Sequence, residues 1–190
     1  LSANECAAEL THWQDIPGIY RVHPEPELEQ LNRIISTFNL DITVPKNIND
    51  PRVLQKILND IKTYDSTEIY TDLLLQAMKR ASYSTKPTGH FGLALPNYTH
   101  FTSPIRRYSD LIVHRLIRKY IFNSDINVNE FRSLTSKLEE IANHSSEKER
   151  ASIQCEYDVD DMKKAEYMEK FVGKTFEGKI SSITNFGMFI

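Results

Sequence analysis

The sequence has few of the features that mark a membrane or secreted protein. Its longest apolar runs are only a few residues, such as 73–75, whereas about 20 apolar residues are needed to cross a bilayer. The chain does not open with a charged segment followed by an apolar run, so a signal peptide is not indicated. We therefore expect a soluble, cytoplasmic protein with no membrane partner.

Cysteine is also scarce. Cys6 and Cys155 are the only two, and they do not form a CxxC pair. Two free thiols in a reducing cytosol is the simplest interpretation. Zinc sites are built from clusters of Cys and His, and the six histidines form no HxH or HExxH pattern. The sequence therefore indicates no zinc site.

The chain does contain enough apolar residues for a core, together with one concentrated block of positive charge. Hydrophobic residues make up 40% of the 190, which excludes a disordered tail. Residues 76–120 hold eight basic residues and one acid, Asp110, giving +7, while the rest holds 15 basic and 25 acidic residues, giving −10. Such a block is typical of a phosphate-binding surface. From charge alone, a solvated face without a ligand is an equally good interpretation.

Apolar residues at helical spacing account for most of the chain, and such stripes are typical of core packing. We expect helices at 3–10, 24–38, 51–61 with Asp50 as N-cap, 66–81, 104–122 and 129–171. Ile19, Tyr20 and Val22 are strand-like, and the Gly- and Pro-containing segment 82–101 suits a strand or an ordered loop. The fold class predicted is α+β and mostly helical.

The last predicted helix becomes strongly polar over 144–161, even where its apolar stripe should continue, as at Ser145. This part either lines a water-filled channel or simply leaves the core. After Gly173 the apolar pattern changes to period two, which predicts a hairpin over 178–190 with its turn at Thr184 and Asn185. A hairpin cannot close a barrel, so we expect it to begin a further domain.

The segment HFGLALPNYTHFTSPIRR, residues 90–107, carries the chemistry. Ser103 and Pro104 predict the N-cap and first position of a helix, which places Arg106 and Arg107 in or just past its first turn. Cations there oppose the helix dipole by up to roughly 1 kcal/mol. A phosphate bound by the guanidinium groups and the helix N–H groups would explain them. The alternative is a salt bridge to an acid elsewhere.

Four aromatic residues accompany these arginines. Aromatic rings beside basic groups can stack the bases of a single strand. Phe91 and Tyr108 are instead expected in the core, since Tyr108 shares a helical stripe with Ile105 and Ile112. For Tyr98 and Phe101 both interpretations stay open.

Residues 89–115, GHFGLALPNYTHFTSPIRRYSDLIVHR, closely resemble the signature of the ribonuclease II and ribonuclease R family, whose catalytic unit is the RNB domain. ANECAAE, HSSEKERA with EYDVDD, and GKTFEGKISSITNFGMFI resemble the same family in the same order, and the last resembles the first strands of an OB-type RNA-binding domain. The piece HFTSPIRRYSDL fits the ribonuclease R branch better. The resemblance implies that residues 1–171 are the C-terminal part of an RNB domain and 172–190 the beginning of a truncated OB-fold.

The resemblance further implies a processive, magnesium-dependent hydrolase that degrades single-stranded RNA from its 3′ end to nucleoside 5′-monophosphates. In the family, Mg²⁺ is held by aspartates in the first part of the catalytic domain, which this sequence does not include. Asp158, Asp160 and Asp161 match a later piece, so we assign no metal ligand and expect the isolated chain to be inactive. No small-molecule cofactor is expected.

The resemblance also assigns roles to individual residues. Arg106 matches the arginine that contacts the scissile phosphate. The remaining matches are expected to place the RNA, four in the same motif and one at a channel-lining position of the long helix: His100, Thr102, Ser103, Arg107 and Glu156. Two other classes compete with the enzyme: a non-catalytic single-stranded RNA-binding module, and a helical interaction domain whose basic segment is a solvated surface.

Overall fold

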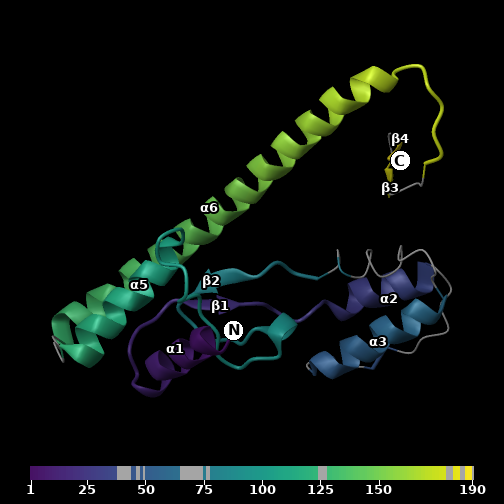
Figure 1. The fold of residues 1–190 in the computed structure, drawn as a ribbon. Coiled ribbons are helices and arrows are strands. Elements are labelled where there is room, and N and C mark those ends of the chain that lie inside the picture. Colours follow the sequence, from purple (N-terminus) through teal and green to yellow (C-terminus); the bar gives the residue numbers. More distant parts are fainter. Residues whose placement is uncertain are drawn as a thin grey trace. The chain divides into compact units, whose positions relative to one another are not determined.

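The computed structural model describes residues 1–37, 44–45, 48, 50–64, 75, 78–123, 128–178, 182–184 and 187–189 (Figure 1). The chain divides into two compact units, Leu1–Lys148 and Glu149–Ile190. Among the described residues, none of the helices is long and apolar enough to cross a membrane.

Helix α1, Ser2–Trp13, confirms the first predicted helix, and it buries a face made of Asn4, Ala7, Ala8 and Thr11. Strand β1, Tyr20–Val22, follows as predicted. It pairs antiparallel with β2, Ser82–Ser84, so that Arg21 lies opposite Tyr83. The predicted strand at the start of 82–101 is therefore confirmed, and a 3₁₀ turn, Phe91–Leu93, lies within the same segment.

Helices α2, Leu28–Thr37, and α3, Pro51–Tyr64, pack side by side (Figure 1). Helix α2 begins four residues later than predicted, because Glu25 precedes a proline and is thereby disfavoured in helical conformation. The start predicted for α3 is confirmed: the Arg52 N–H donates to Asp50 Oδ1 at 2.9 Å. Phe91 joins the apolar cluster of α2 and α3, which confirms its predicted place in the core.

Most of the helix predicted over 66–81 lies outside the described residues. The predicted end of this helix at Ala81 is wrong. Lys79, Arg80 and Ala81 are not helical, and they lead directly into β2.

Helix α5 covers Tyr108–Ile117 and continues into a π-helical turn, Arg118–Phe122. The prediction that it begins at Pro104 with Ser103 as N-cap is wrong. Ser103 begins a single turn, closed by a 3.1 Å hydrogen bond from the Arg107 N–H to the Ser103 carbonyl. Arg107 then adopts an extended backbone and is the N-cap itself. The buried Asp110 carboxylate accepts hydrogen bonds from the Ser103 N–H and from Arg107 Nη2, and it thereby ties both ends of this turn to α5.

The later start of α5 also overturns the prediction that Tyr108 lies in the core. Tyr108 is 52% exposed and Ile105 is fully exposed. The helix buries instead a stripe that begins at Ile112, and this stripe packs with Ile19, Tyr83 and Leu138 in one core cluster.

Helix α6, Val128–Met168, with the 3₁₀ turn Glu169–Phe171, confirms the long helix predicted over 129–171. Leu138, Ala142 and Ser146 are buried at intervals of four residues, whereas residues 154–168 are all exposed. Exposure of this polar part is compatible with both a channel wall and a helix that has left the core.

The predicted C-terminal hairpin is confirmed as β3, Ser182–Thr184, paired antiparallel with β4, Gly187–Phe189. Its predicted turn residue Asn185 lies outside the described residues. The mostly helical α+β class is confirmed, while assignment of the hairpin to an OB-fold stays a prediction.

Candidate nucleic-acid interface

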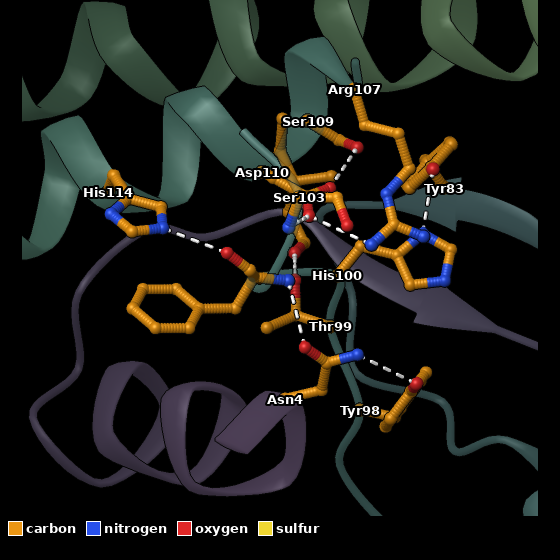
Figure 2. A network of polar contacts seen from close by, with 12 residues as sticks. Asn4, Tyr83, Tyr98, Thr99, His100, Ser103, Arg107, Ser109, Asp110 and His114 are labelled. Atoms are coloured by element: carbon orange, nitrogen blue, oxygen red, sulfur yellow. Dashed lines mark hydrogen bonds and ion pairs between the residues drawn. The ribbon is translucent and has the colours of Figure 1, made fainter. Parts of the chain in front are cut away.

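Segment 98–107 is an irregular stretch of chain that buried polar side chains hold in place (Figure 2). On α1, the Asn4 side-chain amide donates to the Tyr98 hydroxyl at 2.9 Å and accepts the Phe101 N–H at 3.1 Å. The Thr99 hydroxyl donates to the carbonyl of Ile19 just before β1. A loop fixed at buried atoms loses little conformational entropy when a ligand binds, which favours tight and well-oriented contacts.

The C-terminal half of this segment is organised by Asp110 (Figure 2). The Asp110 side chain is 0% exposed, and its Oδ2 accepts the Ser103 N–H at 2.8 Å and Arg107 Nη2 at 2.9 Å. The Ser109 hydroxyl lies 3.4 Å from Oδ1. The sequence analysis predicted no role for Asp110, which it noted only as the one acidic residue of the basic block 76–120. Its i,i+3 spacing from Arg107 is the signal that could have identified the pair.

The two neighbouring arginines differ in their surroundings. Arg107 is 21% exposed and paired with Asp110, which is the salt-bridge alternative considered from the sequence. Arg106 is exposed, and within the described part of the chain it has no ion-pair partner. Because Arg106 precedes the N-cap of α5, the argument from the helix dipole does not apply to it. What remains is an exposed guanidinium on a turn that buried groups anchor.

The other residues predicted in this motif lie along the same segment. Thr102 is exposed and Ser103 is half-buried. His100 is half-buried, with its Nδ1 2.8 Å from the Tyr83 hydroxyl and its ring edge-on to Tyr83 and Tyr98.

His100 has an unusual protonation equilibrium. Burial, followed by the nearby positive charges of Arg107 and Arg21, lowers its pKa to about 4, although the Asp110 carboxylate acts in the opposite direction. At neutral pH the imidazole is therefore uncharged, and it can contact a ligand only as a hydrogen-bonding group.

For Tyr98 and Phe101 the sequence left two interpretations open, packing in the core and stacking on the bases of a single strand, and the structure favours the first. Tyr98 is buried, with its hydroxyl bonded to Asn4. The Phe101 ring is stacked on His114 with 4.0 Å between centroids, and His114 Nε2 lies 2.8 Å from the Phe101 carbonyl oxygen. Both aromatic rings thus support the segment from within.

Glu156 lies on the exposed part of α6, in the second unit, and its role stays a prediction. Asp158, Asp160 and Asp161 are exposed on the same helix. The described residues contain no group of three or more His, Cys, Asp or Glu side chains that could hold a metal ion. These described residues therefore do not fit a magnesium site. Cys6 and Cys155 are free and exposed.

The lowered histidine pKa values make stability depend on pH. Burial and the neighbouring His23 lower the pKa of His90 to about 4, as burial and arginines do for His100. Unfolded histidines titrate near 6.5, so between about pH 6.5 and 4 the unfolded chain binds more protons and stability falls as the pH falls. We expect a loss of about 2–4 kcal/mol over this window after allowance for partial solvent screening. Urea unfolding at several pH values measures it.

The matching control is His100→Gln, which should remove about half of this pH dependence. A free energy of unfolding that stays constant between pH 6.5 and 5 in the wild type would contradict the burial of neutral imidazoles in this site.

Comparison of the sequence with known proteins identifies the family of this chain. The RNB domain matches residues 1–123. Ribonuclease R 1 of Lactococcus lactis is 46% identical over 193 residues, covering all of this chain and 24% of the relative, and ribonuclease R of Escherichia coli is 36% identical over 197 residues, covering 99% and 24%. The chain therefore belongs to the RNB-domain family. Within that family its resemblance to ribonuclease R extends over its whole length, which confirms the prediction from the motif.

Solved structures give the same result. The apo form of Mycoplasma genitalium RNase R superposes with a TM-score of 0.88 and 39% identity over 99% of this chain and 30% of that chain. Yeast Ssd1, described as a pseudonuclease, superposes with a TM-score of 0.58 and 27% identity over 77% of this chain and 18% of that chain. The chain spans about a quarter of the length of the curated ribonuclease R relatives.

Proposed function

We propose that this chain is the phosphate-holding part of a cytoplasmic, processive exoribonuclease of the ribonuclease R type, which hydrolyses single-stranded RNA from its 3′ end to nucleoside 5′-monophosphates. The observation that carries the proposal is Arg106, an exposed guanidinium on a turn that Asp110 anchors. Support comes from two solved structures of one relative of the same fold, Mycoplasma genitalium RNase R in complex with ribose-methylated single-stranded RNA and in complex with double-stranded RNA.

In this proposal Arg106 binds the scissile phosphate. A guanidinium donates two parallel N–H bonds to phosphate oxygens, and it stabilises the negative charge that develops when the phosphorus is attacked. Because Asp110 fixes Ser103 and Arg107 on either side, the donor geometry is set before the RNA arrives. The hydroxyls of Thr102 and Ser103 and the neutral ring of His100 supply further donors to the RNA backbone. Glu156 is proposed to face the RNA channel.

Hydrolysis in this proposal also requires Mg²⁺, which polarises the phosphate and activates water when it is bound. We assign the metal to parts of the intact enzyme other than this chain, as the resemblance to the family implies. The chain by itself should accordingly bind RNA and release no nucleotides when Mg²⁺ is supplied.

Binding of a labelled single-stranded oligoribonucleotide to the 190-residue chain, measured over a range of salt concentrations, tests this proposal. We expect affinity to fall steeply with salt, because each phosphate contact releases counterions. Arg106→Ala should weaken binding, whereas Lys56→Ala, which removes an exposed positive charge from α3, should not. Nucleotide release by the purified chain, abolished by Arg106→Ala, would show that the metal site had been misplaced.

A second candidate function is a non-catalytic RNA-binding module. It is favoured by one observation, the likeness in fold to Ssd1, which is described as a pseudonuclease. The two functions differ in the intact protein. A module binds RNA without consuming it, and an exoribonuclease releases nucleoside monophosphates in proportion to time.

A further inference from the structure

Phe101 lies within segment 98–107 and is held there by side chains from two helices (Figure 2). Its N–H donates to Asn4 Oδ1 of α1 at 3.1 Å, and its carbonyl oxygen lies 2.8 Å from Nε2 of His114 on α5. The Phe101 ring is stacked on the His114 ring at 4.0 Å between centroids, with 3° between the planes. The position and the orientation of Phe101 are therefore both fixed.

Asn4 is a polar residue in the buried face of α1. It is 6% exposed, and its neighbours on that face include two alanines. Burial of an amide costs free energy unless its polar atoms are hydrogen-bonded, so an apolar residue would serve the packing of α1 equally well. The two hydrogen bonds described for the Asn4 side chain both end on segment 98–107, one at the Tyr98 hydroxyl and one at the Phe101 N–H. Asn4 thus acts on the segment rather than on its own helix.

The direction of both contacts to Phe101 follows from the chemistry of the groups. A backbone N–H only donates, so the Asn4 oxygen faces Phe101 and the Asn4 NH₂ group faces the Tyr98 hydroxyl. A carbonyl oxygen only accepts, so His114 carries a proton on Nε2. Alanine at either position would leave one backbone group of Phe101 without its partner, whereas glutamine in place of His114 can still donate from its amide.

Phe101 lies two residues before the turn that carries Arg106. This turn closes on the Ser103 carbonyl, which accepts the Arg106 N–H at 3.3 Å. The Ser103 N–H is held in turn by Asp110. Two residues span at most about 7 Å, so a displacement of Phe101 also moves Ser103. The anchor at Asp110 alone would let the turn pivot, and the second anchor at Phe101 fixes its direction.

We propose that Asn4 and His114 are positioning residues for RNA hydrolysis, which hold Phe101 and thereby orient the turn that presents Arg106 to the reacting phosphate. This rests on the proposed function, which places Arg106 at that phosphate. Neither residue contacts the RNA itself. A transition state demands closer alignment than a bound substrate does, so loss of either anchor acts on kcat more than on KM.

The first test measures kcat and KM for RNA hydrolysis by the intact enzyme with Asn4→Ala, and Thr11→Val is the matched control. Asn4→Ala should lower kcat on the order of tenfold, because a misplacement of about 1 Å can cost up to about 10²-fold. KM should stay within about twofold of wild type. Thr11 is also buried on α1, at 2% exposed, but its hydroxyl donates to carbonyl oxygens of that helix. Thr11→Val should lower the melting temperature and leave kcat unchanged.

His114 provides an independent test, which also decides the matter if Asn4→Ala does not fold. His114→Ala should lower kcat about as much as Asn4→Ala does. His114→Gln should retain most of the wild-type kcat, because its amide can replace the lost donor to the Phe101 carbonyl. Equal losses of kcat in His114→Ala and His114→Gln would mean that the ring only packs.

A double-substitution cycle shows whether Asn4 acts through Arg106. In an Arg106→Ala enzyme there is no guanidinium left to misplace, so adding Asn4→Ala should not lower kcat further. Losses that multiply, or wild-type kcat in Asn4→Ala and in His114→Ala, overturn the positioning role. A kcat lowered by Arg106→Ala in the same experiment leaves the proposed function standing. Wild-type kcat in Arg106→Ala overturns both.

Discussion

Replacing Arg106 with alanine in the intact enzyme should lower kcat for RNA hydrolysis by about 10²–10³-fold, the usual loss when one preorganised donor to a developing charge is removed. If the proposed function is right, KM should change only a few-fold, because the contacts to the other phosphates of the RNA are kept, whereas the contact at the reacting phosphate strengthens as the reaction proceeds. Steady-state release of nucleoside monophosphates from a labelled RNA measures both constants.

Lys56→Ala is the matched control for that experiment, since it removes one exposed positive charge from a helix outside the motif. Its kcat and KM should equal those of wild type. If Arg106→Ala raised KM and left kcat unchanged, Arg106 would be a general RNA-binding residue, and its assignment to the scissile phosphate would be wrong.

Replacing Asp110 with alanine should destabilise the chain by about 3–5 kcal/mol, because it removes one member of a buried ion pair and leaves the other uncompensated. Arg107 is only 21% exposed, and the Ser103 N–H would lose its acceptor as well. Asp110→Asn retains an acceptor for Ser103 and should cost less. Urea unfolding monitored by circular dichroism gives the free energies.

The double substitution Asp110→Ala with Arg107→Met separates the ion pair from the hydrogen bond to Ser103. Apolar replacement of both members of a buried pair is often close to neutral, so the double variant should be more stable than Asp110→Ala alone. Equal stability of Asp110→Ala and wild type would show that the pair does not anchor the turn.

Elements whose signals are local could be predicted from the sequence. Helix α3 begins at Asp50 and Pro51 as expected because capping and proline geometry act within one turn. Helix α6 could be predicted from apolar residues that repeat at helical spacing over its first turns. The C-terminal hairpin could be predicted because its apolar residues alternate with a period of two.

The start of α5 could not be predicted in the same way. Ser103 and Pro104 are a good local start signal, but the extended backbone of Arg107 separates their turn from α5. Both Ser103 and Arg107 are bound by the buried Asp110 carboxylate, and this tertiary burial leaves no local signal in the sequence. Tyr108 was misplaced for the same reason, since the helical stripe was counted from the wrong residue.

The candidate site was predicted in part. The motif indicated which residues to consider, but burial decided how Arg106 and Arg107 differ, and burial depends on tertiary packing. Asn4 and Arg21 are more than 75 residues away from the segment they contact. No periodicity or spacing in the sequence links residues so far apart, and only the fold brings them to segment 98–107.

The central claim is that Arg106 contacts one particular phosphate near the 3′ end of the RNA. The most direct test is a set of oligoribonucleotides that each carry one uncharged methylphosphonate, with Kd measured for wild type, Arg106→Ala and Lys56→Ala. We expect wild type and Lys56→Ala to lose affinity at the same positions, and Arg106→Ala to be insensitive at one of them, because the contact there is already gone. An identical profile in all three proteins would contradict the claim.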